Sequence, residues 1–354
     1  MKTLLPEEKI TLALRDLYAG YGYTLYKMSK FEEYDTYVRN KAFLASEQIV
    51  VFTDTNGKLM ALKPDVTLSI VKNTKDTEGE VSKVYYDESV YRVAGDSKVF
   101  KEIKQTGVEC IGDVDEYCIS EVLYLAAESL KTISEDYVLD VANIGILSRL
   151  IEATGLSSEG RKQLTQRIKE KNVHGAKELF AEEGVAADKY EKVLEIMTYA
   201  GTPDEVIPRL KKLVGSDDAV EMLARVTAPL GPRVRIDFSV VNDMRYYNGI
   251  IFQGFVKGVP DAILSGGQYD LLLKKMRRIS RAIGFAVRPV LPVREDDGLD
   301  VDAVLVYDET VPVETVREEV RKLVAGGERV LAQKVLPKKI RYGRVVRIGE
   351  GKNA

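Results

Sequence analysis

Residues 239–258 read SVVNDMRYYNGIIFQGFVKG, in which an apolar run ends near Asn248-Gly249 and a second apolar run begins at Ile250. An Asn-Gly pair between two β-prone segments is the strongest short-range signal for a β-hairpin. The stretch therefore predicts two antiparallel strands joined at Asn248-Gly249. It also places Tyr246 and Tyr247 beside the expected turn, which raises the question of whether these strands carry a site.

The rest of the chain alternates strand-like and helical runs. Thr55-Asn56-Gly57 is a second hairpin signal, and residues 81–93 and 103–112 are two further strand candidates. Residues 10–17 carry apolar side chains at helical spacing, and residues 115–131 are also helical in character. Hairpin-linked strands with helices between them predict an α+β fold, an antiparallel sheet with helices on one face.

Composition divides the chain into three parts. A charged, helical segment at 145–230 interrupts a strand-rich core, which comprises residues 1–144 and 231–293. A polar linker follows the core, and residues 299–354 then have the β-α-β pattern of a short α/β domain. We therefore expect a core with a helical insertion and a separate small C-terminal domain.

The bulk composition is that of a globular protein, and it argues against several classes of function. The chain has 354 residues, 45% hydrophobic and 30% charged, and no apolar run approaches the roughly 18 residues of a membrane span. Acidic residues follow the first leucines, so no secretory signal is expected. Two nearby cysteines, Cys110 and Cys118, suit reduced thiols and a cytoplasmic location. A net charge of −3 gives no general attraction to nucleic acid.

The sequence offers few residues for a metal site or for nucleophilic catalysis. The chain contains one histidine, His174, within a charged helical stretch, where we expect a surface position. Histidine-assisted nucleophiles and histidine-rich metal sites are therefore not expected. Neither a GxGxxG motif nor a P-loop is present, so the common nucleotide-binding motifs are missing as well.

Several polar residues stand out, although each also has a structural explanation. Lys63–Thr67 (KPDVT) has the composition of a helix start, and Arg92 can extend from its strand to the surface. Gln105 and Glu109 are four residues apart on an expected strand, which puts both side chains on one face of the sheet. Gly266-Gly267 allows a ligand or another strand to approach closely.

The order of these segments resembles the catalytic core of histidyl-tRNA synthetase over most of residues 1–293. The matching segments are KPDVT, VYR, QTGVECIG, VNDMRYYNG, SGGQYD and IGFAV. The resemblance implies a class II aminoacyl-tRNA synthetase-like fold, an antiparallel sheet flanked by helices. It also implies a histidine pocket formed by Asp65, Thr67, Arg92, Gln105, Glu109, Tyr246, Tyr247, Gly266, Gly267 and Tyr269.

The resemblance also implies roles within this pocket. Asp65, Thr67 and Gln105 would contact the α-amino group of histidine, and Glu109 would contact the imidazole, with Tyr269 nearby. Arg92 corresponds to the arginine with which class II synthetases grip the α-phosphate of ATP. Aspartate replaces the family's glutamate at residue 65 and is one methylene shorter, so this contact would be longer or bridged by water.

Two departures from the synthetase pattern affect catalysis. Asn242 stands where the synthetase has an arginine, and Leu291 stands where the third class II motif ends in an arginine. Adenylate formation is stabilised chiefly by fixed cations, and losing one such group typically costs about 10²–10³ in rate. We therefore expect no catalytic residues, and a histidine pocket whose chemistry has been lost.

This combination resembles the regulatory subunits of ATP phosphoribosyltransferase, which are paralogues of the synthetase. The resemblance implies a non-catalytic subunit without cofactor or metal, which binds histidine and activates the short-form catalytic subunit. In that family the complex is a hetero-octamer containing homodimers of the regulatory subunit. It performs the first step of histidine biosynthesis under feedback inhibition by histidine.

Two alternatives belong to a different class of function. The first alternative is an active histidyl-tRNA synthetase, and the second is another amino-acid ligase built on the same core. Residues 299–354 are few for the synthetase's anticodon-binding domain, and the basic stretch at 329–352 is the one candidate for a tRNA surface. A solvated edge strand explains that stretch equally well, so nucleic acid is not an expected partner.

Overall fold

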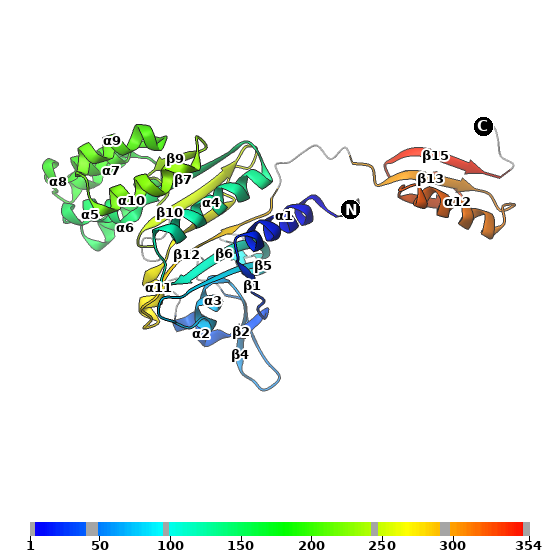
Figure 1. Ribbon diagram of the computed structural model, residues 1–354, viewed down its shortest axis with the longest axis horizontal. Helices are drawn as coiled ribbons and strands as arrows, with labels where there is room; N and C mark the ends of the chain where they lie inside the picture. Colours follow the sequence, from blue (N-terminus) through cyan, green and yellow to red (C-terminus); the bar gives the residue numbers. More distant parts are fainter. Residues whose placement is uncertain (1–3, 40–48, 95–98, 242–246, 291–297, 350–354) are drawn as a thin grey trace. The chain divides into compact units, whose positions relative to one another are not determined.

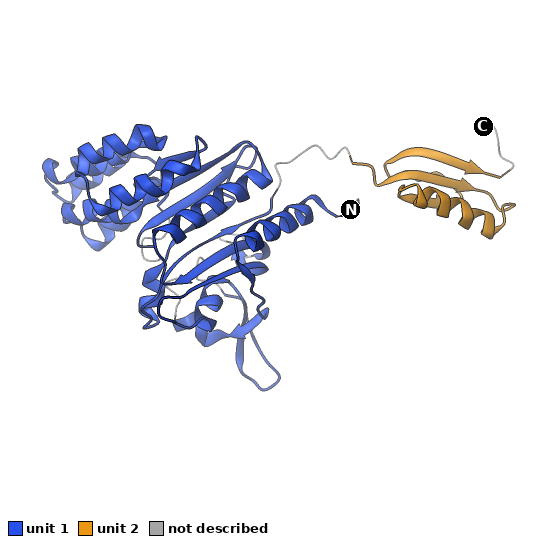
Figure 2. Cartoon of the chain, in the orientation of Figure 1, with its two compact units in different colours: residues 1–293 blue, residues 294–354 orange. Residues whose placement is uncertain are grey.

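The computed structural model describes residues 4–39, 49–94, 99–241, 247–290 and 298–349. The chain forms two compact units, residues 1–293 and residues 294–354 (Figure 2). The predicted further division of the first unit into a core and a helical insertion stays a prediction.

Within the described residues, the first unit is built around a nine-stranded sheet (Figure 1). Its strands in spatial order are β1 (Thr24–Leu25), β5 (Val81–Ala94), β6 (Val99–Gly112), β12 (Arg281–Val287), β11 (Leu264–Gln268), β10 (Ile250–Val256), β7 (Tyr137–Asn143), β9 (Val234–Asp237) and β8 (Ala200–Gly201). The central pairs from β5 to β7 are all antiparallel, whereas β1 pairs with β5, and β9 with β7, in parallel. The predicted antiparallel α+β fold is confirmed.

The long pair β5–β6 confirms the two strands predicted at 81–93 and 103–112. Consecutive side chains alternate between the two faces of the sheet, so neighbouring residues of β5 enter different cores. Tyr85 packs in the larger apolar cluster, whereas Tyr86 packs in a second cluster. This alternation sets the face on which Gln105 and Glu109 lie.

Helices cover both faces of the large sheet, so the expectation of helices on one face is wrong. Helices α1 (Pro6–Gly20) and α4 (Glu116–Ile133) pack on one face with the larger apolar cluster. The short helices α3 (Thr67–Asn73) and α11 (Asp270–Lys275) pack with the second cluster on the other face. The reason is that the central strands carry apolar side chains on both faces, so both faces need a cover.

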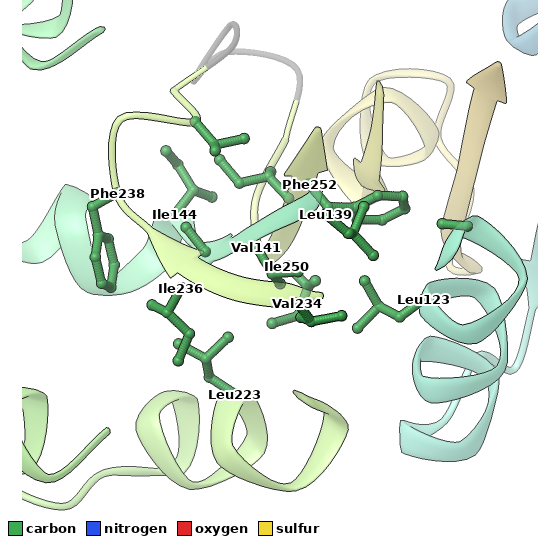
Figure 3. Packing of buried hydrophobic residues seen from close by; sticks show 14 of the residues in the cluster. Leu123, Leu139, Val141, Ile144, Leu223, Val234, Ile236, Phe238, Ile250 and Phe252 are labelled. Carbon is green, nitrogen blue, oxygen red and sulfur yellow. The ribbon is translucent and has the colours of Figure 1, made fainter. Parts of the chain in front are cut away.

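Helix α4 confirms the helix predicted at 115–131. The carboxylate of Asp115 accepts a hydrogen bond from the backbone N–H of Cys118 and caps the first turn. Leu123 on this helix packs toward Leu139 and Phe252 of the sheet (Figure 3). Cys118 and Cys110 are both buried free thiols.

Six α-helices lie between β7 and β9 in the described part of the chain, as the charged segment predicts. They are α5 (Ile144–Thr154), α6 (Ser158–Lys169), α7 (Val173–Glu182), α8 (Ala187–Ile196), α9 (Pro203–Val214) and α10 (Asp218–Thr227), and the 3₁₀ turn η2 (Ala228–Leu230) follows them. Leu223 of α10 packs toward Ile236 of β9 (Figure 3). His174 is exposed on α7, as predicted, with Nε2 3.2 Å from the carboxylate of Glu178.

A small second sheet confirms the hairpin predicted at Thr55-Asn56-Gly57. It consists of β2 (Phe31–Glu33), β4 (Leu59–Leu62) and β3 (Val51–Thr53), and α2 (Tyr34–Arg39) follows β2. The Asp54 N–H bonds the Lys58 carbonyl, and Gly57 has a φ of +78°, which glycine adopts without strain. We call the described residues of 31–62 the small lobe.

The hairpin predicted at Asn248-Gly249 is wrong. Strand β10 lies between β7 and β11, and β9 pairs with the far side of β7. The Asn248 side chain instead bonds Asp270, and Gly249 leaves room for the Gln268 side chain, whose Oε1 accepts the Ile250 N–H. Residues 242–246 lie outside the described part of the chain.

Within its described residues, 298–349, the second unit is a three-stranded parallel sheet with one helix. Strands β13 (Val301–Tyr307), β14 (Val330–Gln333) and β15 (Tyr342–Ile348) are arranged with β13 in the centre, and α12 (Val313–Ala325) connects β13 to β14. The predicted β-α-β pattern is confirmed, and β15 adds a third strand. No helix in the described parts of either unit is long and apolar enough to cross a membrane.

Candidate functional site

A cavity of about 120 Å³ lies on the face of the large sheet that α3 and α11 cover. Three neighbouring strands, β6, β12 and β11, supply its floor. It is lined by Thr67, Arg92, Gln105, Glu109, Tyr247, Ser265, Tyr269, Gly284, Phe285 and Ala286. The cavity therefore combines one carboxylate, one guanidinium, an amide, two aliphatic hydroxyls and two phenols.

Strand register brings these side chains together from distant parts of the sequence. Glu109 of β6 lies directly opposite Gly284 of β12, and Ala286 lies opposite Ser265 of β11. Gln105 is four residues before Glu109, so its side chain lies on the same face. The predicted shared face of Gln105 and Glu109 is confirmed, because both side chains line the cavity.

Glu109 is the chemical centre of the cavity. Its carboxylate is about 1% exposed and accepts hydrogen bonds from Thr67 Oγ1 at 2.6 Å and from the Tyr269 hydroxyl at 2.5 Å. Burial raises the pKa of Glu109 to about 8, although the two hydroxyl donors oppose that change. Because this pKa lies above neutrality, the carboxyl group is largely protonated without a ligand, and an N–H donor or a cation bonded to it would favour its ionised form.

Glycine makes the space that the Glu109 carboxylate occupies. A Cβ added at Gly284 would overlap Glu109 Oε2 and lie 2.5 Å from the Val108 carbonyl oxygen. A Cβ at Gly267 would lie 2.8 Å from the Tyr247 ring. These two positions explain why IGFAV and SGGQYD carry glycine within strands, where it is otherwise unfavourable.

Residues 63–67, which we call the connector, join β4 of the small lobe to α3. The buried Lys63 ammonium lies 2.5 Å from the Glu88 carboxylate, and the Pro64 carbonyl accepts from Arg92 Nε at 2.9 Å. Asp65 accepts the Leu68 N–H at 2.8 Å, which confirms the predicted helix start. Burial raises the pKa of Asp65, and the Arg92 charge opposes that change.

Asn248 positions the start of α11 and, through it, Tyr269. Its amide donates to the Asp270 carboxylate at 3.0 Å, and its carbonyl oxygen accepts the Asp270 N–H at 2.9 Å. The other Asp270 oxygen accepts the Ala282 N–H of β12. Tyr269, the residue before Asp270, is thereby held with its hydroxyl against Glu109.

The structure brings most of the predicted pocket together. Asp65, Gly266 and Gly267 are not among the residues that line the cavity. Gly266 lies on the opposite face, where an added Cβ would meet Phe252 and Phe285. The predicted pocket residues that do line the cavity are Thr67, Arg92, Gln105, Glu109, Tyr247 and Tyr269.

Three predicted positions, Tyr246, Asn242 and Leu291, lie outside the described residues. Arg288, the described arginine nearest to Leu291 in the sequence, donates from its guanidinium to the Ala262 carbonyl at 2.6 Å and does not line the cavity. Among described residues, the structure shows no cluster of three or more histidine, cysteine or acidic side chains suited to a metal ion.

Sequence reasoning missed the floor of the cavity. Ser265, Gly284, Phe285 and Ala286 line it but were not predicted as site residues. Ser265 directly precedes the glycine pair, and Gly284 to Ala286 lie in the IGFAV segment, so the motifs were identified but their side-chain directions were not. A strand register, which only the fold supplies, was the missing information.

A family model described as Histidyl-tRNA synthetase matches residues 4–290. The match covers the large sheet, the small lobe and the helices between β7 and β9. The fold and the cavity therefore define a protein of the class II synthetase-like type, related to histidyl-tRNA synthetase.

A relative from Thermoanaerobacter sp. (strain X514) is named ATP phosphoribosyltransferase regulatory subunit. It is 31% identical over 305 residues, which are 81% of this chain and 79% of the relative. Further relatives with the same name are 27–30% identical. The chain belongs to the family of ATP phosphoribosyltransferase regulatory subunits.

Solved structures share the fold at lower identity. An ATP phosphoribosyltransferase regulatory subunit/histidyl-tRNA synthetase from Bacillus halodurans C has a TM-score of 0.74 at 24% identity, covering 97% of this chain and 93% of its own. A chain of the ATP phosphoribosyl transferase (HisG:HisZ) complex from Thermotoga maritima has a TM-score of 0.63 at 18% identity, covering 79% of this chain and 96% of its own.

Proposed function

We propose that this regulatory subunit binds histidine in the cavity and transmits its presence to a short-form catalytic subunit. The observation that carries the proposal is Glu109, a buried carboxylate with two hydroxyl partners at the floor of a small polar cavity. The subunit would both activate the catalytic subunit and mediate feedback inhibition by histidine.

The groups of the cavity match those of histidine. An imidazole N–H is a suitable donor to Glu109, and the phenols of Tyr247 and Tyr269 can lie against the imidazole ring. Thr67 and Gln105 offer oxygen acceptors for the α-amino group, and the Arg92 guanidinium is the cation in the cavity. Asp65 accepts the Leu68 N–H through one oxygen and does not line the cavity, so its contact with the α-amino group stays a prediction.

The proposal assigns no aminoacylation activity to the chain. The synthetase-like positions Asn242 and Leu291 carry no cation, and the nearby Arg288 bonds a backbone carbonyl rather than lining the cavity. Adenylate formation depends on fixed cations around the transferring phosphoryl group. The active synthetase and the other amino-acid ligase therefore remain the less favoured functions.

Substituting Glu109 by glutamine should weaken histidine binding by roughly 1–3 kcal/mol. The amide keeps the shape of the side chain but loses the charge-assisted acceptor for the imidazole N–H. Isothermal titration calorimetry of the full chain with histidine measures this change.

A matched control is available on the same strand. Glu102→Gln is the same substitution outside the cavity, at an exposed side chain that accepts a hydrogen bond from the Tyr91 hydroxyl. It should leave the affinity for histidine at the wild-type value. Equal affinities of the Glu109→Gln and wild-type chains would remove Glu109 from the site.

Purified chain incubated with ATP, magnesium and histidine should produce no ATP–pyrophosphate exchange above background. The expected reason is the loss of two cationic side chains, each worth about 10²–10³ in rate. An authentic histidyl-tRNA synthetase serves as the positive control, and other amino acids are tested in place of histidine. Robust exchange with any of them would establish a ligase and overturn the non-catalytic assignment.

The proposed assembly follows the family resemblance and the comparisons. The solved HisG:HisZ complex from Thermotoga maritima contains a chain of the same fold, which supports partnership with a catalytic subunit. We propose a homodimer of this chain within a hetero-octamer, located in the cytoplasm. Co-elution of the two subunits and the mass of the complex test this arrangement.

A further inference from the structure

Thr67 differs from the other residues that line the cavity in its position in the chain. The other lining residues belong to the strands of the large sheet, or are Tyr247 and Tyr269 beside them. Thr67 is the described lining residue at the end of the connector, which continues directly from β4 of the small lobe. A ligand in the cavity therefore contacts the connector, which leads to the small lobe, through the side chain of Thr67.

Three side-chain contacts tie the connector to the large sheet. Lys63 pairs with Glu88, the Pro64 carbonyl accepts from Arg92, and Thr67 donates to Glu109. The large-sheet partners in the last two contacts, Arg92 and Glu109, themselves line the cavity. The ligand site and the attachment of the connector thus use the same two charged groups.

We propose that Thr67 couples occupancy of the cavity to the small lobe. A bound amino acid that contacts Thr67 together with Arg92 and Glu109 adds to the bonds Thr67–Glu109 and Pro64–Arg92, and it thereby fastens the connector more firmly to the large sheet. The inference rests on the proposed function and adds the route by which occupancy leaves the site. Thr67 acts here as a coupling residue in addition to a binding contact.

The β3–β4 hairpin is a suitable reporter of this coupling. Its residues, 51–62, do not line the cavity, so a ligand cannot shield their amides by direct contact. Its backbone hydrogen bonds include Asp54 N to Lys58 O and Leu62 N to Val50 O. The connector bonds back to the lobe as well, from Lys63 N to Lys30 O.

Hydrogen–deuterium exchange of the full chain, followed by mass spectrometry, tests the proposal. Saturating histidine should slow exchange of residues 51–62 by roughly tenfold, the factor expected when one charge-assisted hydrogen bond is added. Thr67→Val removes the hydroxyl at nearly constant volume, so its chain should lose this slowing. Calorimetry fixes the histidine concentration at which each variant is occupied.

Matched variants separate coupling from general damage to α3. Thr74→Val makes the same substitution at the end of α3, where the hydroxyl bonds the Ile70 carbonyl, and should preserve the slowing. Thr67→Ser keeps the hydroxyl and should preserve it too, which covers the case in which Thr67→Val does not fold.

The outcomes distinguish this inference from the proposed function. Binding heat in the wild-type chain without slower exchange at 51–62 overturns the coupling and leaves histidine binding intact. Slowing that persists in an occupied Thr67→Val chain overturns the role of Thr67. Absence of any binding heat overturns the proposed function, and this inference with it.

Discussion

Replacing Glu88 by alanine lowers the expected free energy of unfolding by about 3–5 kcal/mol, because it strands a buried ammonium. Lys63 is 0% exposed in its side chain, and its partner Glu88 is 12% exposed. With Glu88 gone, Lys63 either keeps an uncompensated charge inside the protein or gives up its proton, and both outcomes are costly. Urea denaturation of the full chain, followed through the unfolding transition of its first unit, measures the lost free energy of unfolding.

Two control variants distinguish the effect of burying the Lys63 charge from the effect of losing an ion pair. Glu33→Ala breaks the exposed Lys58–Glu33 pair in the small lobe, where both side chains are more than half exposed, and should leave the free energy of unfolding close to the wild-type value. The double variant Lys63→Met, Glu88→Leu removes both charges and should regain most of the lost stability. A Glu88→Ala chain as stable as the Glu33→Ala chain would contradict the burial of this pair.

Replacing Gly284 by alanine should abolish measurable histidine binding. The added methyl group overlaps the Glu109 carboxylate and would also lie 2.5 Å from the Val108 carbonyl oxygen of the same strand, β6, so the β6–β12 pair leaves it no room. Glu109 must therefore leave its hydroxyl partners, and the cavity loses its acceptor. The overpacking itself should destabilise the fold by about 1–3 kcal/mol, and calorimetry with histidine measures the binding.

Gly20→Ala is the matched control for this substitution. Gly20 ends α1, and a Cβ there meets no atom within 4 Å. This variant should bind histidine normally and be at least as stable as the wild type, because alanine favours helix over glycine. Wild-type histidine affinity in a folded Gly284→Ala chain would show that the Glu109 carboxylate is not in the binding site.

Local sequence signals predicted the elements whose partners are close in the sequence. The hairpin at Asn56-Gly57 and the β5–β6 pair form from neighbouring segments, so turn chemistry and side-chain alternation sufficed. The shared face of Gln105 and Glu109 followed from the same alternation. These features needed no knowledge of the remaining sheet.

The Asn248-Gly249 signal failed because distant strands competed successfully for β10. Strand β7, more than a hundred residues earlier, pairs with all seven residues of β10, and β11 takes its other edge. Burial of Ile250 and Phe252 in the larger core outweighs the local preference for a turn. Asn248 then serves α11 through Asp270 instead of closing a hairpin.

The predicted pocket was incomplete for a related reason. Motif resemblance identified Thr67 and Glu109, whereas the direct opposition of Glu109 and Gly284 depends on the register between β6 and β12. The resemblance also implied a ligand contact for Asp65, which stays a prediction; one of its carboxylate oxygens accepts the Leu68 N–H at the start of α3. A sequence shows which residues carry a motif, but only the register shows which of them face one another.

The turnover of a short-form catalytic subunit tests the central claim most directly. The purified catalytic subunit from the same source is assayed with ATP and phosphoribosyl pyrophosphate, alone, with this chain, and with this chain plus histidine. Turnover should rise roughly tenfold when the chain is added, and histidine should reverse the rise, as expected for a typical allosteric coupling of 5–150-fold. With Glu109→Gln, the activation should remain and more histidine should be needed. Unchanged turnover in the presence of the chain would contradict the account.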